Sequence, residues 1–188
     1  MFKTTKNLIQ IMYRDKEKQR KTQRRYYILH KEKIKTLFNQ EPKVFRNTEL
    51  IYNNVLAKFI ENLGYEGIIA EGWDHYLKER SPNFVYSPPH AQKIKLLLKN
   101  YKLSDDIAFR FSTQSWSEWP LTVEKYAQWV SSVNGNGECV NLFMDYETIG
   151  EHQWKETGIF DFLEKLPTEI LKNPDNSFAT PSELTKLQ

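Results

Sequence analysis

The sequence predicts an α/β protein in which parallel strands are covered by outer helices. Apolar runs of strand length alternate four times with segments of helical periodicity, and each strand-like run ends in polar, charged or aromatic residues. The composition, with 39% hydrophobic and 27% charged residues, is typical of a globular chain. The 188 residues suffice for one sizeable core.

A basic segment precedes this α/β body. Residues 1–36 contain 12 of the 27 Lys and Arg residues but only three of the 24 acidic ones. Basic clusters such as residues 20–25 also suit phosphate contacts, yet acidic and apolar side chains recur among them at helical spacing. We therefore interpret residues 1–40 as a basic helical leader resting one apolar stripe on the body, and expect no nucleic-acid partner.

Other features bound the class of protein. No apolar run approaches the roughly 20 residues that cross a bilayer, and the first residues lack the apolar stretch of a secretory signal. The single cysteine, Cys139, excludes an internal disulfide and a multi-cysteine metal site. We expect a soluble, cytoplasmic protein without a membrane partner.

The first two strand–helix units follow the leader. Residues 44–45 form a short apolar run, and apolar residues then recur at 3.6-residue spacing from Leu50 to Leu63, where Gly64 ends the pattern. We predict a strand followed by an amphipathic helix. The second unit pairs a strand at residues 67–70 with a helix around residues 94–98.

The last two units have the same form. We predict a third strand at residues 107–111, followed by a helix with Val123, Tyr126, Ala127 and Val130 on one face. A fourth strand is predicted at residues 139–144 and a last helix at residues 160–171. Residues 41–172 would thus form the body, and residues 173–188 a tail.

Functional side chains are expected where the strands end, because the carboxyl ends of parallel strands meet on one face. Arg46 and Glu49 follow the first strand, Trp73 the second, and Asp145 and Glu147 the fourth. Carboxylates beside indole rings favour carbohydrate chemistry, since two carboxylates cleave a glycosidic bond while aromatic faces pack on the sugar.

Two segments resemble the catalytic motifs of glycoside hydrolase family 57, in its α-amylase-like branch. They are VFRNTELIY at residues 44–52 and LFMDYETIGEHQW at residues 142–154, and their acids Glu49 and Asp145 lie 96 residues apart. Residues 71–74, 81–86 and 104–112 are also similar to that branch. The resemblance extends from about residue 40 to the end.

The resemblance implies an incomplete, seven-stranded (β/α) barrel, of which this chain would supply strands 4–7. It implies a retaining enzyme acting on α-1,4-glucans or maltooligosaccharides, with Glu49 as nucleophile and Asp145 as general acid/base. Such a mechanism needs the two carboxyl groups about 5–5.5 Å apart. We expect the charge of Glu49 and partial burial to favour a protonated Asp145.

Further residues are expected to bind substrate. Glu147 would share a face with Asp145 if strand geometry continues, His152 would donate a hydrogen bond, and Trp154 is the best sugar platform. Trp73 is a second platform, although tryptophans are equally often core residues.

Arg46 has two roles that the sequence leaves open: it would orient the nucleophile or pair with an acid. His75, His90 and His152 match no compact ligand spacing. We predict neither a metal nor a cofactor.

The family's N-terminal His-Gln-Pro motif, its third-strand motif and the motif of its C-terminal helical region have no counterpart here, and Ile149 replaces a usual Phe. The chain would be an active fragment, or an inactive remnant that binds glucan weakly or pairs with a complementary half-barrel chain. Hydrolysis and 4-α-glucan transfer remain open, because both use the same covalent intermediate. Exposed outer strands at residues 44–47 and 139–144 would favour self-association.

Overall fold

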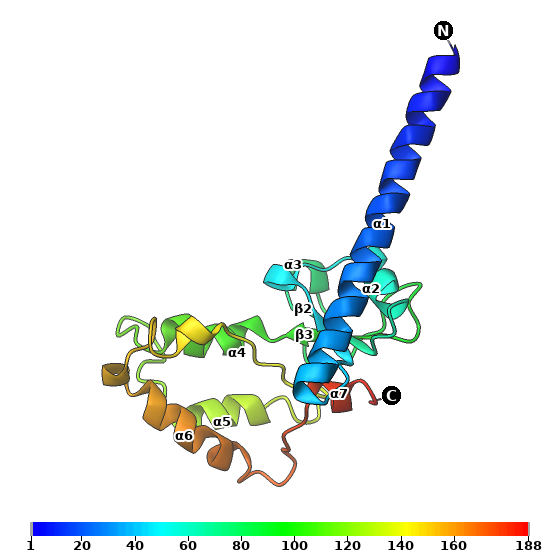
Figure 1. Ribbon diagram of the computed structural model, residues 1–188. Helices are drawn as coiled ribbons and strands as arrows, with labels where there is room; N and C mark the ends of the chain where they lie inside the picture. Colours follow the sequence, from blue (N-terminus) through cyan, green and yellow to red (C-terminus); the bar gives the residue numbers. More distant parts are fainter. Residues whose placement is uncertain (1, 188) are drawn as a thin grey trace.

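A computed structural model describes the backbone of residues 2–187 and the side chains of residues 15–187. Its centre is a three-stranded parallel sheet of β1 (Val44–Arg46), β2 (Gly67–Glu71) and β3 (Lys95–Lys99), in that order. Helices lie on either side of the sheet, and the long helix α1 projects from it (Figure 1). Parallel strands with outer helices are therefore confirmed.

The strand register gives the sheet two chemically different faces. Phe45 lies beside Ile68, and both pack against α2 (Asn54–Glu61), which buries Ala57 and Ile60 on them. Because side chains alternate along a strand, Arg46, Ile69 and Leu97 share the opposite face. Glu71 and Lys99 pair on that same face, at the carboxyl edge.

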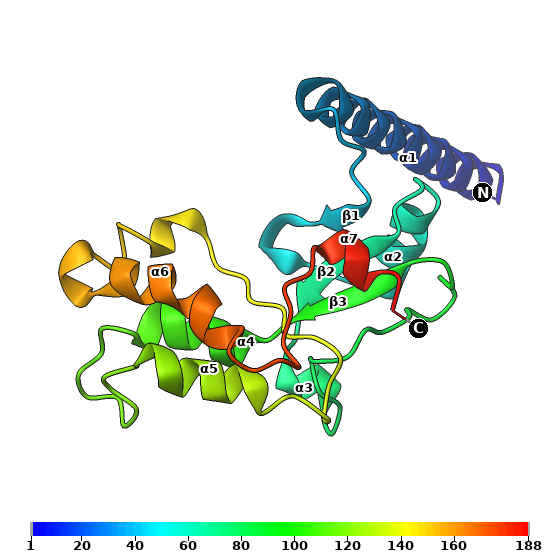
Figure 2. The same cartoon turned by 90° about the horizontal axis from the view of Figure 1, so that it is seen from below.

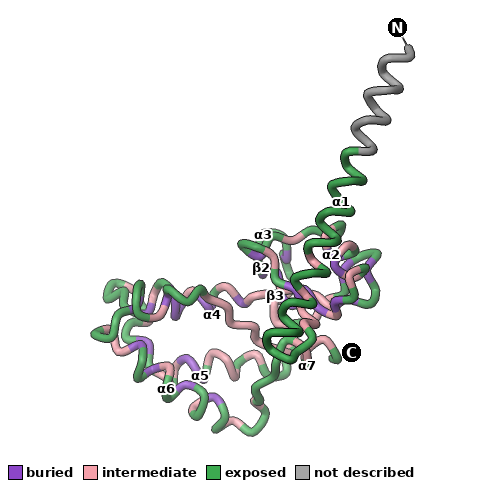
Figure 3. Tube along the Cα trace, in the orientation of Figure 1, coloured by how far each residue is buried: buried purple, intermediate pink, exposed green. Residues whose placement is uncertain are grey.

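The basic leader is a helix, α1 (Phe2–Phe38), with a small footprint on the body. Tyr27 packs edge-on against Phe45 and Phe59, with ring centroids 5.5 and 6.0 Å away. Lys31 lies 3.4 Å from Glu41 and donates to the Gly64 carbonyl. The rest of the described part is mostly exposed (Figure 3), as expected for a solvated helix that rests one stripe on a body.

A second core lies beside the sheet, between three helical segments. Tyr101–Asp105 (α4) runs directly into a π-helical turn at Asp106–Arg110, and both pack against α5 (Val123–Ser131) and α6 (Ile159–Ile170). Figure 2 shows this group standing apart from the strands. The remaining elements are short: α3 (Asp74–Leu77), α7 (Pro181–Leu184) and 3-10 turns at Thr48–Leu50, Tyr146–Thr148 and Lys155–Thr157.

None of the helices in the described residues is long and apolar enough to cross a membrane.

The predicted helices at residues 50–63 and 94–98 need correction. The first begins only at Asn54, because the Asn53 side chain accepts a hydrogen bond from the Leu56 amide at 2.8 Å and caps the helix there. The second is wrong, because residues 95–98 belong to the strand β3. A short apolar run such as Leu96–Leu98 has no periodicity that separates a helix from a buried strand.

The predicted strand at residues 107–111 is also wrong, because these residues continue the helical segment. Asn100 caps its start by accepting from the Leu103 amide at 3.1 Å. Leu103, Ile107 and Phe111, spaced four apart, are all buried in the second core. The helical periodicity therefore begins at Leu103, before the segment predicted as a strand.

The predicted fourth strand at residues 139–144 forms only one parallel bridge, between Asn141 and Lys99. The Asn141 side chain donates to the Leu98 carbonyl at 3.0 Å, and the Phe143 amide donates to Ser104 Oγ at 3.1 Å. Hydrogen bonds to side chains thus replace most of the backbone pairing that a strand would form. The described sheet has three strands and is not closed, so the predicted number of four strands is wrong. The predicted division of the chain into leader, body and tail at residues 40 and 172 stays a prediction.

Gln153 joins the loop after residue 144 to the second core. Its side chain is 2% exposed and donates to the Ala108 carbonyl in the π-helical turn at 3.0 Å. Its amide donates to the Thr148 carbonyl at 2.8 Å. The loop is consequently fixed to a helix that lies 45 residues earlier in the chain.

We predict that Gly72→Ala destabilises the fold. A Cβ at Gly72 would overlap the Lys99 carbonyl oxygen and lie 2.8 Å from Pro82 Cβ, so backbone must move. The expected loss is about 1–3 kcal/mol in the free energy of unfolding, measured by denaturant titration. Gly135→Asn is the control, because a Cβ there meets nothing within 4 Å and Asn tolerates its φ of 81°. Equal stability of the two variants would contradict this packing.

Gln153→Ala should lower the free energy of unfolding by about 1–3 kcal/mol, because it leaves the Ala108 carbonyl without its side-chain donor. The same denaturant titration measures the change. Gln128→Ala, at an exposed position of α5, should change stability by less than about 0.5 kcal/mol. A Gln153 variant as stable as the Gln128 variant would show that the loop is held by other contacts.

Candidate active site

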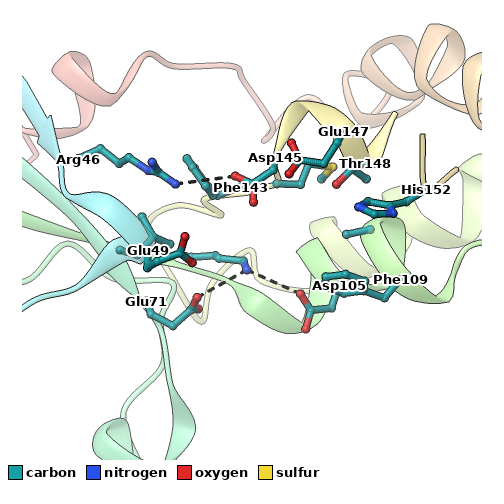
Figure 4. A pocket seen from close by; sticks show the side chains of 14 residues that line it. Arg46, Glu49, Glu71, Asp105, Phe109, Phe143, Asp145, Glu147, Thr148 and His152 are labelled. Atoms are coloured by element: carbon teal, nitrogen blue, oxygen red, sulfur yellow. Dashed lines mark ion pairs between the residues drawn. The ribbon is translucent and has the colours of Figure 1, made fainter. Parts of the chain in front are cut away.

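A cavity of about 140 Å³ lies where the carboxyl edge of the sheet meets the second core. It is charged: five carboxylates, two basic side chains and one histidine line it together with apolar residues. Figure 4 shows these groups facing one another across the opening. The charged and imidazole residues are Arg46, Glu49, Glu71, Lys99, Asp105, Asp145, Glu147 and His152.

Glu49 reaches this cavity from a strained turn. Glu49 and Leu50 have φ values of 52° and 54°, a left-handed conformation that costs non-glycine residues about 1 kcal/mol or more each. Leu50 is 5% exposed, so burial of its side chain offsets part of that cost. The Asn47 side chain donates to the Ile51 carbonyl at 3.1 Å and closes the turn.

The opposite wall carries Asp145, Glu147 and His152. Asp145 is extended, and a 3-10 turn starts immediately after it, so the strand geometry expected to align Glu147 with Asp145 does not continue. Glu147 lines the cavity nonetheless. The His152 amide donates to the Glu147 carbonyl at 3.0 Å, which closes the loop on itself.

The charged side chains of the cavity form two separate sets of ion pairs. Arg46 lies 3.8 Å from Asp145, and its guanidinium lies 4.9 Å from the centre of the Phe143 ring. Lys99 lies 3.6 Å from Glu71 and 3.7 Å from Asp105. Among residues 15–187, no basic side chain forms an ion pair with Glu49. Of the two roles left open for Arg46, the contact observed is pairing with an acid.

The surroundings of Asp145 differ from the expectation of partial burial. Its side chain is 64% exposed, so water reaches the carboxylate freely. An ion pair that exposed contributes at most about 1 kcal/mol. The expectation that Asp145 is partly buried is therefore wrong.

Trp73 and Trp154, the two tryptophans predicted as sugar platforms, do not line the cavity. Trp73 is 53% exposed and packs at 5.2 Å, between ring centroids, against both His75 and Tyr76. Trp154 is 62% exposed in the loop after Gln153. Both remain accessible, and their platform roles stay predictions. Within the described residues, no group of three potential ligands is placed to hold a metal ion.

Sequence patterns missed several lining residues. Neither Lys99 nor Asp105 is among the predicted site residues, because the sequence predicts a helix around residues 94–98 and a strand only from residue 107. Correct assignment of β3 and α4 would have found both. Phe143, inside the second motif, was expected in a strand and instead lies under Arg46.

Two comparisons bear on identity. Glycosyl hydrolase family 57 matches residues 18–188, beginning inside α1 and thus earlier than the resemblance near residue 40. A protein of Methanocaldococcus jannaschii named "Putative alpha-amylase" is 51% identical over 156 residues, which is 83% of this chain and 32% of that protein. The chain thus spans about a third of the length of this relative. Because the family match covers nearly the whole chain, the chain belongs to glycosyl hydrolase family 57.

Proposed function

We propose that this chain carries the catalytic carboxylates of a retaining glycoside hydrolase that acts on α-1,4-glucans. The observation that supports this most is that Glu49 and Asp145, 96 residues apart in sequence, line one cavity from different walls. Family membership and a relative named as an alpha-amylase support the substrate class.

In the first step Glu49 attacks the anomeric carbon of the sugar. The glycosidic bond breaks as a glycosyl ester forms with Glu49, while Asp145 donates its proton to the departing oxygen. Glu49 suits the attack because its charge is not compensated by a described ion pair.

In the second step Asp145, now ionised, removes a proton from an incoming hydroxyl, whose oxygen bonds to the anomeric carbon as the ester bond to Glu49 breaks and frees the Glu49 carboxylate. Water as the acceptor gives hydrolysis, and a sugar hydroxyl gives glucan transfer. Each step inverts the anomeric carbon once, so the configuration is retained in both reactions. The Arg46 guanidinium, 3.8 Å from Asp145, stabilises the carboxylate that the first step produces. We expect Glu147 and His152 to bind substrate hydroxyls at the same wall.

A second candidate is a binding or half-barrel component without turnover of its own. The charged cavity, about 140 Å³, is smaller than the roughly 300–1,000 Å³ of typical ligand sites. Ile69 and Leu97 border another cavity of about 640 Å³, so the sheet face that carries Arg46 is incompletely filled. These openings favour a site that residues from another chain or segment complete.

We predict that Glu49→Gln lowers the rate of maltooligosaccharide hydrolysis by at least about 10³-fold, because an amide cannot form the glycosyl ester. Reducing-sugar release from maltoheptaose measures the rate, and proton NMR of the first product should show the α-anomer. Chains longer than the starting oligosaccharide would identify transfer.

Glu66→Gln is the matched control, because Glu66 pairs with Lys43 at 3.0 Å on the exposed outer surface and does not line the cavity. It should hydrolyse maltoheptaose like the unchanged protein. Activity that survives Glu49→Gln would overturn the assigned nucleophile. No turnover by the unchanged chain, together with measurable maltoheptaose binding, would favour the second candidate.

A further inference from the structure

Lys99 is the more shielded of the two basic side chains that line the charged cavity. Its backbone is paired with Glu71 in the sheet, bridged to Asn141 on the other side, and contacted by Gly72 at its carbonyl. Its side chain is 15% exposed, against 41% for Arg46. The lysine stem therefore leaves a rigid strand and has little freedom to reorient.

The Lys99 ammonium lies between two walls of the cavity. Glu71 belongs to β2 and Asp105 to the end of α4, and Lys99 Nζ is 3.6 Å from Glu71 Oε2 and 3.7 Å from Asp105 Oδ1 (Figure 4). Both distances exceed those of direct hydrogen bonds, so the attraction is between charges. Lys99 thus links the sheet that carries Glu49 to the helix that continues into Ala108 and Phe109.

Charge balance explains why a cation is needed at this place. Glu49, Glu71 and Asp105 line one cavity, and Lys99 is the cation that pairs with two of them. Without Lys99, Glu71 and Asp105, whose side chains are 40% and 24% exposed, would lose their shared counter-charge and repel each other, which would favour a movement of α4 away from the sheet.

We propose that Lys99 is a positioning residue, which by pairing with Glu71 and Asp105 fixes the helical wall of the cavity relative to the sheet wall that carries Glu49. Its effect on turnover rests on the proposed function, whereas its effect on the walls does not. A displacement of about 1 Å is enough to cost an enzyme roughly 100-fold in rate.

Three variants test the proposal in the full chain. Lys99→Met keeps the stem and removes the charge, Lys99→Arg restores a cation, and Lys43→Met is the control. Lys43 also pairs with an acid, Glu66, at 3.0 Å, but its side chain is 43% exposed and lies outside both α4 and the cavity. Glu71→Gln and Asp105→Asn each remove one of the two pairs, and they carry the test if Lys99→Met does not fold.

Amide hydrogen exchange and amide NMR shifts measure the walls without any need for activity. In Lys99→Met we expect exchange of the α4 amides at least fivefold faster, and shift changes at Ala108 and Phe109. Lys99→Arg and Lys43→Met should leave both unchanged, and each single acid variant should have a smaller effect in the same direction. Unchanged α4 exchange in Lys99→Met, or in both acid variants, would overturn the proposal.

Maltoheptaose kinetics provide the second measurement. We expect kcat of Lys99→Met to fall at least tenfold with KM within threefold of its original value, and Lys99→Arg to recover most of the loss. An equal fall in kcat in Lys99→Arg and Lys99→Met would overturn the positioning role. If the unchanged chain shows no turnover, the proposed function fails, and hydrogen exchange alone decides the role of Lys99.

Discussion

The parallel register of β1, β2 and β3 is the constraint on which the candidate site depends. By aligning Arg46 with Ile69 and Leu97, and Glu71 with Lys99, it places three charged side chains on one face at the carboxyl edge. A shift of one residue would turn each of them toward α2 and bring Phe45 and Ile68 to the opening. Burial of Phe45 and Ile68 against α2 opposes that shift, so the apolar face fixes the charged one.

The cavity lies between two cores because β3 runs almost directly into α4. Only Asn100 separates the strand from the helix, and its buried side chain caps α4 while its backbone amide donates to Asn141. The sheet therefore ends where the helical core begins, and acids from both meet there. The strained turn at Glu49 fits the same pattern, since buried Leu50 anchors a conformation that the local sequence alone would disfavour.

Sequence patterns predicted elements whose periodicity is unambiguous. The runs at β1 and β2, and the apolar faces of α5 and α6, were assigned correctly because neighbouring glycines, caps and 3.6-residue spacing agree with the tertiary packing. The exchange of helix and strand around Asn100 could not be foreseen, since the Leu96–Leu98 run fits both. The run becomes a strand in the folded chain because Leu96 pairs with Ile68 on one side and with Tyr86 on the other.

The site was predictable for a different reason. Arg46, Glu49, Asp145, Glu147 and His152 follow predicted strands, and they line one cavity even though residues 139–144 form a single bridge rather than a strand. An extended segment held by Asn141 and Phe143 delivers Asp145 to the same edge that a strand would. Lys99 was missed because its position depends on β3, and the exposure of Asp145 was missed because exposure depends on what covers the loop.

The two ion-pair sets differ in a way that bears on how the cavity would work. Arg46 and Asp145 are both largely exposed and 3.8 Å apart, so water screens their attraction and separating them costs little. Lys99 and Asp105 are more shielded, with side chains 15% and 24% exposed, so their separation costs more, whereas Glu71, at 40%, is about as exposed as Arg46. A sugar could therefore take the place of water around Asp145 and redirect Arg46 while the walls stay fixed. The cavity thus joins one exposed charge pair, which includes the proposed proton donor, to a more shielded Lys99–Asp105 pair that also lines the cavity of the proposed nucleophile.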